Sequence, residues 1–264
     1  MKKVLAMAVA LVLVFGLVAC GNSNGGNSGN SGNSGNSGSS EGEASEVQAK
    51  SEGVMTYEEY AAASLDTEVV VETFVQDKQS WWDDTVTVYS QDADGGYFLY
   101  QMSCAQEDFD KLVEGQKIKV KGVKSEWSGE IEIVDATFEI MDGNYIAEAV
   151  DATGLLGSAD LIKHQNQKVA FKGMTIEGIA DADGNEFPFL YNWDGSGSQG
   201  DDLYFNASVN GEIYSFCVES YLRDSSTDVY KAVEGLQIGD TVDMEGFMYW
   251  YNGPQPHITG ITVK

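Results

Sequence analysis

A tripeptide that occurs twice constrains the fold of this chain more than any other feature. Val113-Glu114-Gly115 recurs as Val233-Glu234-Gly235. Each copy follows a short helical pattern and precedes an alternating, strand-like segment; these two segments are residues 116–122 and 240–246. Each unit then continues through a Trp-bearing loop to a last alternating segment, residues 131–140 and 257–263. We therefore expect two related domains in tandem.

The residues before each tripeptide complete the unit. Each unit begins with an alternating strand and continues with a hairpin. In the first unit these segments are residues 68–75, 85–90 and 97–103, and in the second they are 168–179, 203–209 and 212–218. Asn210-Gly211 joins the second hairpin and is the strongest short-range signal for a hairpin turn. Each unit thus has five strands, with a helix between the third and the fourth.

This order of elements resembles the OB-fold. The resemblance is to a topology without a signature motif, and it covers nearly all of residues 55–264. It implies an all-β fold with short helices, in which two tandem five-stranded OB-like β-barrels occupy residues 54–145 and 146–264. An SH3-like barrel or a generic five-stranded sandwich is the competing assignment.

The first twenty residues have the pattern of an export signal. Lys2 and Lys3 precede an apolar run from Val4 to Phe15, which is shorter than the ~20 residues that span a bilayer. Leu17-Val18-Ala19-Cys20 resembles the lipobox of bacterial lipoproteins. This resemblance implies that residues 1–19 are removed and that Cys20 becomes the lipidated first residue. A plain secretory signal is the alternative.

Residues 20–53 read as a disordered tether. Asn24 to Ser40 is almost wholly Gly, Asn and Ser, a composition that cannot bury enough apolar surface to fold. A flexible chain of this kind has an end-to-end distance of roughly 30 Å. Such tethers are frequent on lipoproteins of Gram-positive bacteria, so the resemblance implies a lipid-anchored protein on the extracytoplasmic face of the cell membrane.

The charge of the chain narrows the class of partner. The sequence has 15 Lys and Arg against 42 Asp and Glu, a formal net charge of −27. Proteins that bind nucleic acid through its phosphates need a basic footprint, so we expect nucleic acid to be an unlikely partner. Anionic lipid headgroups are repelled as well, so contact with the membrane is expected through the N-terminal lipid.

Aromatic side chains in the loops are the main candidates for a binding site. Trp82 lies between the first and second strands of the first unit, next to Trp81, and an extended pair of neighbours faces opposite ways. The other candidates lie in the corresponding loops of the two units; they are Trp127, Trp193, Tyr249, Trp250 and Tyr251. OB-folds bind oligonucleotides or oligosaccharides with such loops. The alternative is that these side chains plug the ends of the barrels.

Two charged patterns favour structural roles. Lys117, Lys119 and Lys121 alternate on one strand, and we expect Glu130 and Glu132 of the neighbouring strand to pair with them. Asp181, Asp183 and Asn185 resemble a fragment of a calcium loop but lack its distal Glu, so ordinary turn chemistry is favoured over weak calcium binding. No other metal or cofactor is expected.

No catalytic motif stands out. Cys217 with His257 is an imaginable nucleophile and base, but Cys104 occupies the equivalent position of the first unit without a histidine. Because Cys104 and Cys217 are equivalent in tandem copies, a disulfide between them is improbable.

The sequence therefore predicts a noncatalytic binding module for a glycan, a cell-wall component or a protein partner. A hydrolase that uses acidic residues at a barrel mouth is one alternative, and a structural or accessory subunit of a surface assembly is another.

Overall fold

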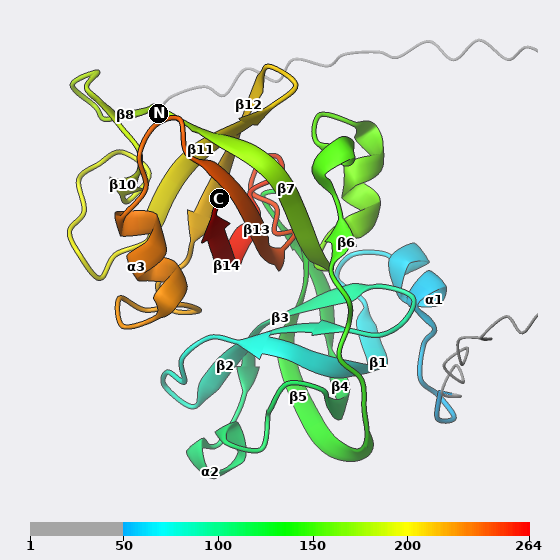
Figure 1. Ribbon diagram of the computed structural model, residues 1–264. Coiled ribbons are helices and arrows are strands. Elements are labelled where there is room, and N and C mark those ends of the chain that lie inside the picture. Colours follow the sequence, from blue (N-terminus) through cyan, green and yellow to red (C-terminus); the bar gives the residue numbers. More distant parts are fainter. Residues whose placement is uncertain (1–49) are drawn as a thin grey trace, which may run out of the picture. The chain divides into compact units, whose positions relative to one another are not determined.

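The structure is a computed structural model that describes residues 50–264 (Figure 1). The signal sequence, the lipidation candidate Cys20 and residues 21–49 of the predicted tether lie outside the described residues. Within the described part, none of the helices has the length and apolar character needed to cross a membrane.

The first half of this part is a closed five-stranded barrel. Its strands are β1 (Glu68–Lys78), β2 (Thr85–Gln91), β3 (Gly96–Ser103), β4 (Gln116–Trp127) and β5 (Glu130–Asn144). They follow the order β1-β2-β3-β5-β4 and close between β4 and β1, and only the β3–β5 pair is parallel. The short helix α2 (Gln106–Phe109) lies between β3 and β4, and α1 (Tyr57–Ala62) precedes β1 behind a capping box of Thr56 and Glu59.

The second half repeats this plan with additions. The barrel strands are β7 (Lys168–Glu177), β11 (Leu203–Val209), β12 (Glu212–Val218), β13 (Thr241–Phe247) and β14 (His257–Val263). They pair in the order β11-β12-β14-β13-β7, the β11–β7 pairing closes the ring, and β12–β14 is its parallel pair. Helix α3 (Asp228–Glu234) stands between the third and fourth barrel strands, as α2 does.

Smaller elements decorate the second barrel. Strands β6 (Val150–Asp151) and β10 (Leu190–Tyr191) extend its sheet, and β8 (Ile179–Ala180) pairs with β9 (Glu186–Phe187) in a separate hairpin. Two 3₁₀ helices, η1 (Thr153–Leu155) and η2 (Ala159–His164), connect the barrels. The predicted fold class, an all-β chain with two tandem five-stranded OB-like barrels, is confirmed.

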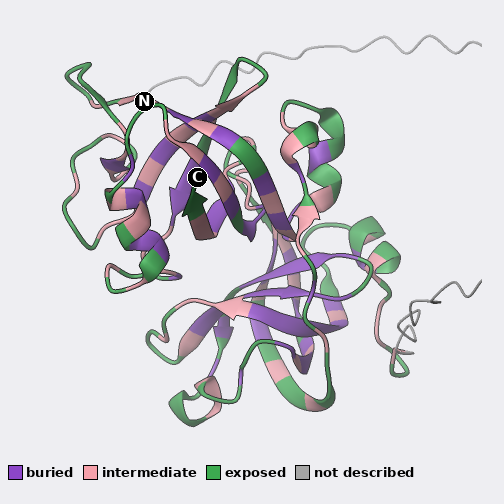
Figure 2. Cartoon of the chain, in the orientation of Figure 1, coloured by how far each residue is buried: buried purple, intermediate pink, exposed green. Residues whose placement is uncertain are grey.

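Each barrel has its own apolar core, and Figure 2 shows buried residues along the strands of both barrels. In the first barrel the core is built around Val71, Val88, Leu99 and Ile118, and in the second around Phe171, Phe205 and Phe216. These cores arise because alternate residues of a strand face the same side of the sheet.

The lysine stripe pairs with a different strand than predicted. Lys117 Nζ lies 2.8 Å from the Glu72 carboxylate, and Lys121 Nζ lies 3.0 Å from the Glu68 carboxylate. Both glutamates are on β1. β4 lies between β1 and β5, so its side chains can reach either neighbour. The prediction that Glu130 and Glu132 are the partners is wrong, because the register of β4 and β5 places these two residues opposite Trp127 and Ser125, away from the three lysines.

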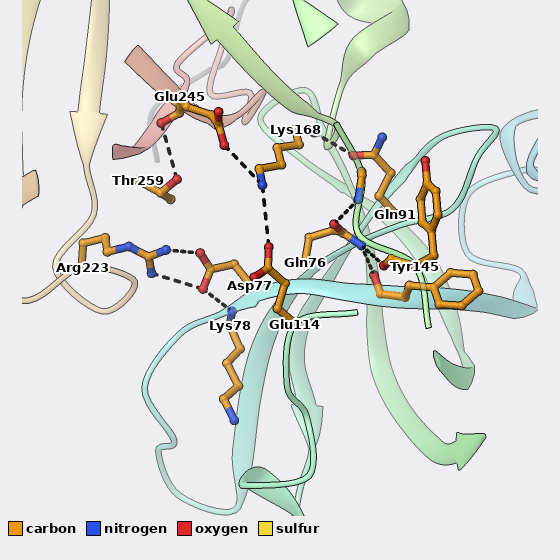
Figure 3. A network of polar contacts seen from close by, with 12 residues as sticks. Gln76, Asp77, Lys78, Gln91, Glu114, Tyr145, Lys168, Arg223, Glu245 and Thr259 are labelled. Atoms are coloured by element: carbon orange, nitrogen blue, oxygen red, sulfur yellow. Dashed lines mark hydrogen bonds and ion pairs between the residues drawn. The ribbon is translucent and has the colours of Figure 1, made fainter. Parts of the chain in front are cut away.

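A polar network joins the two barrels (Figure 3). The guanidinium of Arg223 forms an ion pair with Asp77, and Lys168 Nζ lies 3.2 Å from Glu245 and 3.7 Å from Glu114. Deeper in the contact, Tyr89 stacks on Phe247 with ring centroids 4.4 Å apart. The barrels therefore meet through both packed rings and ion pairs.

Candidate functional site

A pocket of about 840 Å³ lies between the two barrels. The first barrel contributes residues of β2, β3, the end of β4 and the β1–β2 loop. The second contributes residues of β11, β12, the start of β14 and the neighbouring loops. Ligand pockets commonly have volumes of ~300–1,000 Å³, so this one is large enough for a ligand of several rings.

Aromatic side chains from both barrels line the pocket. Five of the six sequence candidates are among them, namely Trp82, Trp127, Trp193, Tyr249 and Tyr251. Three of these are largely open to solvent: Trp193 is 73% exposed, Trp82 is 71% exposed and Trp127 is 60% exposed. Aromatic rings of this size in water mark a surface that a ligand can cover.

Tight turns hold these rings in place. Trp82 and Thr85 exchange two backbone hydrogen bonds of 2.9 and 3.0 Å, and the two residues between them, Asp83 and Asp84, have φ values of 47° and 56°. Positive φ at both central positions defines a type I′ turn, whose twist matches that of the flanking strands. The turn therefore defines the backbone position from which the indole of Trp82 extends.

Residues with positive φ also flank other aromatic residues of the pocket. Ser128, with a φ of 52°, follows Trp127 in the turn between β4 and β5. Asn192 precedes Trp193 with a φ of 58°, and Asn252 follows Tyr251 with a φ of 55°. Left-handed backbone of this kind is uncommon outside Gly, Asn and Asp, and it concentrates at functional sites.

Two candidates have other surroundings. Trp250 does not line the pocket; its ring packs against the core of the second barrel, and its backbone N–H donates to Glu130 Oε2 at 2.8 Å. Tyr249 lines the pocket but is partly covered, because it stacks on His257 with ring centroids 4.2 Å apart. Trp81 is half-buried and donates to the Cys104 carbonyl at 2.8 Å, so only Trp82 of the adjacent pair is free.

The charged side chains that line the pocket, among the described residues, are both carboxylates. Glu219 Oε2 accepts from Gln79 Nε2 at 2.9 Å, and Asp202 Oδ1 accepts from the backbone N–H of Ser220 at 2.8 Å. Burial, followed by the charge of Asp202, raises the pKa of Glu219 to about 7. The pocket thus combines aromatic faces with negative charge.

Cys217 and His257 are brought together, but in states unsuited to covalent catalysis. They are register partners on the parallel strands β12 and β14, and both line the pocket. Burial raises the pKa of the Cys217 thiol and lowers the pKa of His257 to about 3. The thiol is therefore neutral, whereas a nucleophilic cysteine needs its thiolate. Cys104 and Cys217 are both buried free thiols.

The calcium candidate forms a turn. Asp181 Oδ1 accepts hydrogen bonds of 2.9 Å from the backbone N–H groups of Asp183 and Asn185, and Asn185 Nδ2 donates to Asp181 Oδ2 at 3.1 Å. These donors occupy the oxygens that a calcium ion would need. Within residues 50–264 there is no group of three or more His, Cys, Asp or Glu placed to hold a metal.

Several pocket residues were not predicted from the sequence. Four further rings line it, Phe98, Tyr100, Tyr204 and Tyr221, together with the two carboxylates and His257. Phe98 and Tyr100 alternate on β3, which places them on one face. The alternation of Phe98 and Tyr100 can be seen in the sequence. No local sequence pattern, however, indicates that the second barrel packs beside this face and makes it a wall of the pocket.

Comparisons with known proteins add a weak likeness in structure. No family model matches the sequence, and no curated protein matches it. A solved structure described as "p202 HIN1 in complex with 12-mer dsDNA" is similar with a TM-score of 0.36 and 10% identity, over 77% of this chain and 96% of that chain. "Crystal structure of Ifi202 HINa domain in complex with 20bp dsDNA" has a TM-score of 0.33 and 10% identity, over 75% and 98% of the two chains.

A third structure, of a "Replication Protein A Heterotrimer Bound to ssDNA", has a TM-score of 0.29 and 10% identity, over 77% of this chain and 51% of that chain. The prediction that nucleic acid is an unlikely partner is contradicted by these comparisons, because the similar structures include DNA complexes. Net charge averages over the whole surface, so a total of −27 does not exclude a nucleic acid at one site.

Proposed function

We propose that this chain is a noncatalytic binding module that engages a glycan through the aromatic pocket between its barrels. The observation that carries the proposal is the convergence of nine aromatic side chains from both barrels on one hollow of about 840 Å³. Sugar rings present flat, apolar C–H faces, and such faces cover exposed indole and phenol rings while the hydroxyl groups bond to polar neighbours.

The shape and lining of the pocket favour a glycan over a folded protein partner. A standard protein interface buries about 800 Å² on each side, whereas this site is a hollow lined by aromatic rings from both barrels. Its neutral hydrogen-bonding groups include the side-chain amides of Gln79, Gln101 and Gln255 and the hydroxyl of Thr87. This mixture of stacking surfaces and neutral polar groups is suited to a chain of sugars.

Titration of oligosaccharides against the purified full-length chain tests the proposal. Bound sugar should quench or shift the tryptophan fluorescence, because Trp82, Trp127 and Trp193 are exposed in the pocket. The double substitution Trp82→Ala with Trp127→Ala should weaken binding at least tenfold. Phe187→Ala is the matched control, since this ring is also exposed, at 42%, but lies outside the pocket lining.

The competing ligand class is nucleic acid, and the same assay includes it. Single-stranded and duplex oligonucleotides are titrated under identical salt. Tighter binding of either one than of every glycan tested, lost with the same double substitution, would replace the glycan proposal with a nucleic-acid one. Loss of glycan binding in the control variant would show that the effect is not specific to the pocket.

We further propose that the protein works on the extracytoplasmic face of the membrane, held there by lipid on Cys20. The support is the sequence pattern from Lys2 to Cys20 alone. Replacement Cys20→Ala should release the protein from the membrane fraction and abolish its labelling by a fatty acid. Retention of both lipid and membrane association in that variant would refute the anchor.

A further inference from the structure

The pocket holds negative charge that the protein itself does not neutralise. Glu219 and Asp202 accept hydrogen bonds from neutral groups, and neither forms an ion pair within residues 50–264. No Lys or Arg of the described part lines the pocket. Burying a carboxylate without a cation is unfavourable, so a cationic ligand would gain from these two groups.

The pKa of Glu219 agrees with an uncompensated carboxylate. Its two largest causes, burial and the charge of Asp202, both act to disfavour the ionised form. A positive charge beside Glu219 would offset both effects and restore the carboxylate.

An unpartnered polar group beside these carboxylates is a second sign of a ligand. The His257 ring lines the pocket and is only 6% exposed. Its Nδ1 lies 2.8 Å from the Tyr89 hydroxyl, and Nε2 has no hydrogen-bond partner in the part of the chain that the structure describes. In one neutral tautomer Nε2 donates and in the other it accepts, and a sugar hydroxyl can meet either.

The aromatic walls suit a cation as well as a sugar. The faces of Trp and Tyr carry negative charge density, and an ammonium group within about 6 Å of such a ring is attracted to it. Tyr204 and Tyr249 line the pocket together with Glu219. Rings and carboxylates thus surround the same space.

We propose that the ligand is a glycan with free amino groups, whose ammonium lies against Glu219 and Asp202 while its sugar rings stack on the exposed tryptophans. The inference rests on the proposed glycan function and specifies its chemical class. It predicts discrimination between an amino sugar and the same sugar with its nitrogen acetylated, since acetylation removes the positive charge and keeps the ring.

Isothermal titration of the full-length chain with two probes tests this inference. The probes are the β-1,4-linked tetrasaccharide of glucosamine and the tetrasaccharide of N-acetylglucosamine. The glucosamine tetrasaccharide should bind roughly tenfold more tightly or better, in keeping with a charged hydrogen bond. Glu219→Gln should abolish this preference, so that the two probes bind with equal affinity.

Two further variants keep the test decisive. Glu212→Gln is the control, because Glu212 is an exposed residue at the other end of β12, and it should retain the full preference. Asp202→Asn preserves the acceptor for Ser220 and should reduce the preference even if Glu219→Gln does not fold.

The results distinguish the proposed glycan-binding function from the further inference that the glycan carries free amino groups. Equal affinity of the wild-type protein for both probes overturns the amino-sugar inference and leaves the glycan function standing. An undiminished preference in folded Glu219→Gln and Asp202→Asn overturns the role of the carboxylates. Binding of neither probe overturns the inference, while binding of other glycans in the fluorescence assay would still support the proposed function.

Discussion

Glu130 supplies a sharp test of how burial controls charge in this protein. Its side chain is fully buried where the first barrel meets the second, and Oε2 accepts from the Trp250 N–H at 2.8 Å and from Gln165 Nε2 at 3.2 Å. Oε1 is buried without a hydrogen-bond donor in the described part of the chain. Burial is the largest cause that raises the pKa of Glu130, to about 8. At neutral pH the group is therefore mostly protonated.

The sign of the effect on stability follows from this raised pKa. Between pH 4.5 and pH 8 the unfolded chain releases the Glu130 proton while the folded chain keeps it, so the free energy of unfolding falls as the pH rises. A side chain that never ionises serves as the reference. Compared with it, the wild-type Glu130 lowers the free energy of unfolding by about 1 kcal/mol at pH 5 and by about 4 kcal/mol at pH 8, using ~1.36 kcal/mol for each pH unit.

The substitution Glu130→Gln removes the ionisation and keeps the shape and the acceptor oxygen. We expect the variant to be more stable than the wild type by about 1 kcal/mol at pH 5 and by about 4 kcal/mol at pH 8. Urea unfolding followed by tryptophan fluorescence should show the midpoint of the variant raised by roughly 1–2 M at pH 8. The control is Glu139→Gln, an exposed position on the same strand, which should not separate from the wild type at either pH.

A difference between Glu130→Gln and the wild type that does not change between pH 5 and pH 8 would refute this reasoning. It would mean that Glu130 is ionised in the folded protein, and that the hydrogen bonds it accepts from the Trp250 N–H and the Gln165 side-chain amide outweigh its burial.

Three further substitutions test the fold. Gly246→Ala should destabilise the protein by about 3 kcal/mol or more in the same urea assay, because a Cβ there would lie 2.0 Å from the His257 carbonyl oxygen. Gly260→Ala, where no atom lies within 4 Å of the added Cβ, should have little effect, and equal losses would contradict the model of a close strand contact. Lys124→Met should cost about 2–3 kcal/mol, because the ammonium donates to three carbonyls at the end of α1 at 2.9 Å each; an unchanged thermal midpoint would count against that role. Trp81→Phe should cost about 1–3 kcal/mol through loss of its hydrogen bond to a buried carbonyl after β3, and no loss in calorimetry would show that the bond is unimportant.

Local sequence patterns predicted the barrels well, because strand alternation and turn chemistry act over a few residues. The Asn210-Gly211 turn falls between β11 and β12 as expected, with φ values of 54° and 84°. Local sequence patterns do not show which of two neighbouring strands a side chain will contact, because that depends on the order of strands in the barrel. For this reason Lys117 was assigned a partner on β5, whereas it pairs with Glu72 of β1.

The candidate site was predictable only in part. An aromatic residue next to a turn is visible in the sequence, and this pattern led to Trp82, Trp127 and Tyr251. The same pattern included Trp250, whose ring instead packs on a core. The carboxylate of Glu219 could not be singled out, because one acidic residue among 42 is uninformative until the fold places it beside the aromatic rings.

Because the pocket lies between the two barrels, ligand binding should affect how the barrels unfold. Each barrel has a separate apolar core, so each has the means to unfold on its own, while the pocket exists only when both are folded and in contact. A bound ligand that touches both walls adds its binding free energy to that joined state alone. Saturation with ligand should therefore merge the melting of the two barrels into one cooperative transition, and the protein would resist a pulling force better when loaded than when empty.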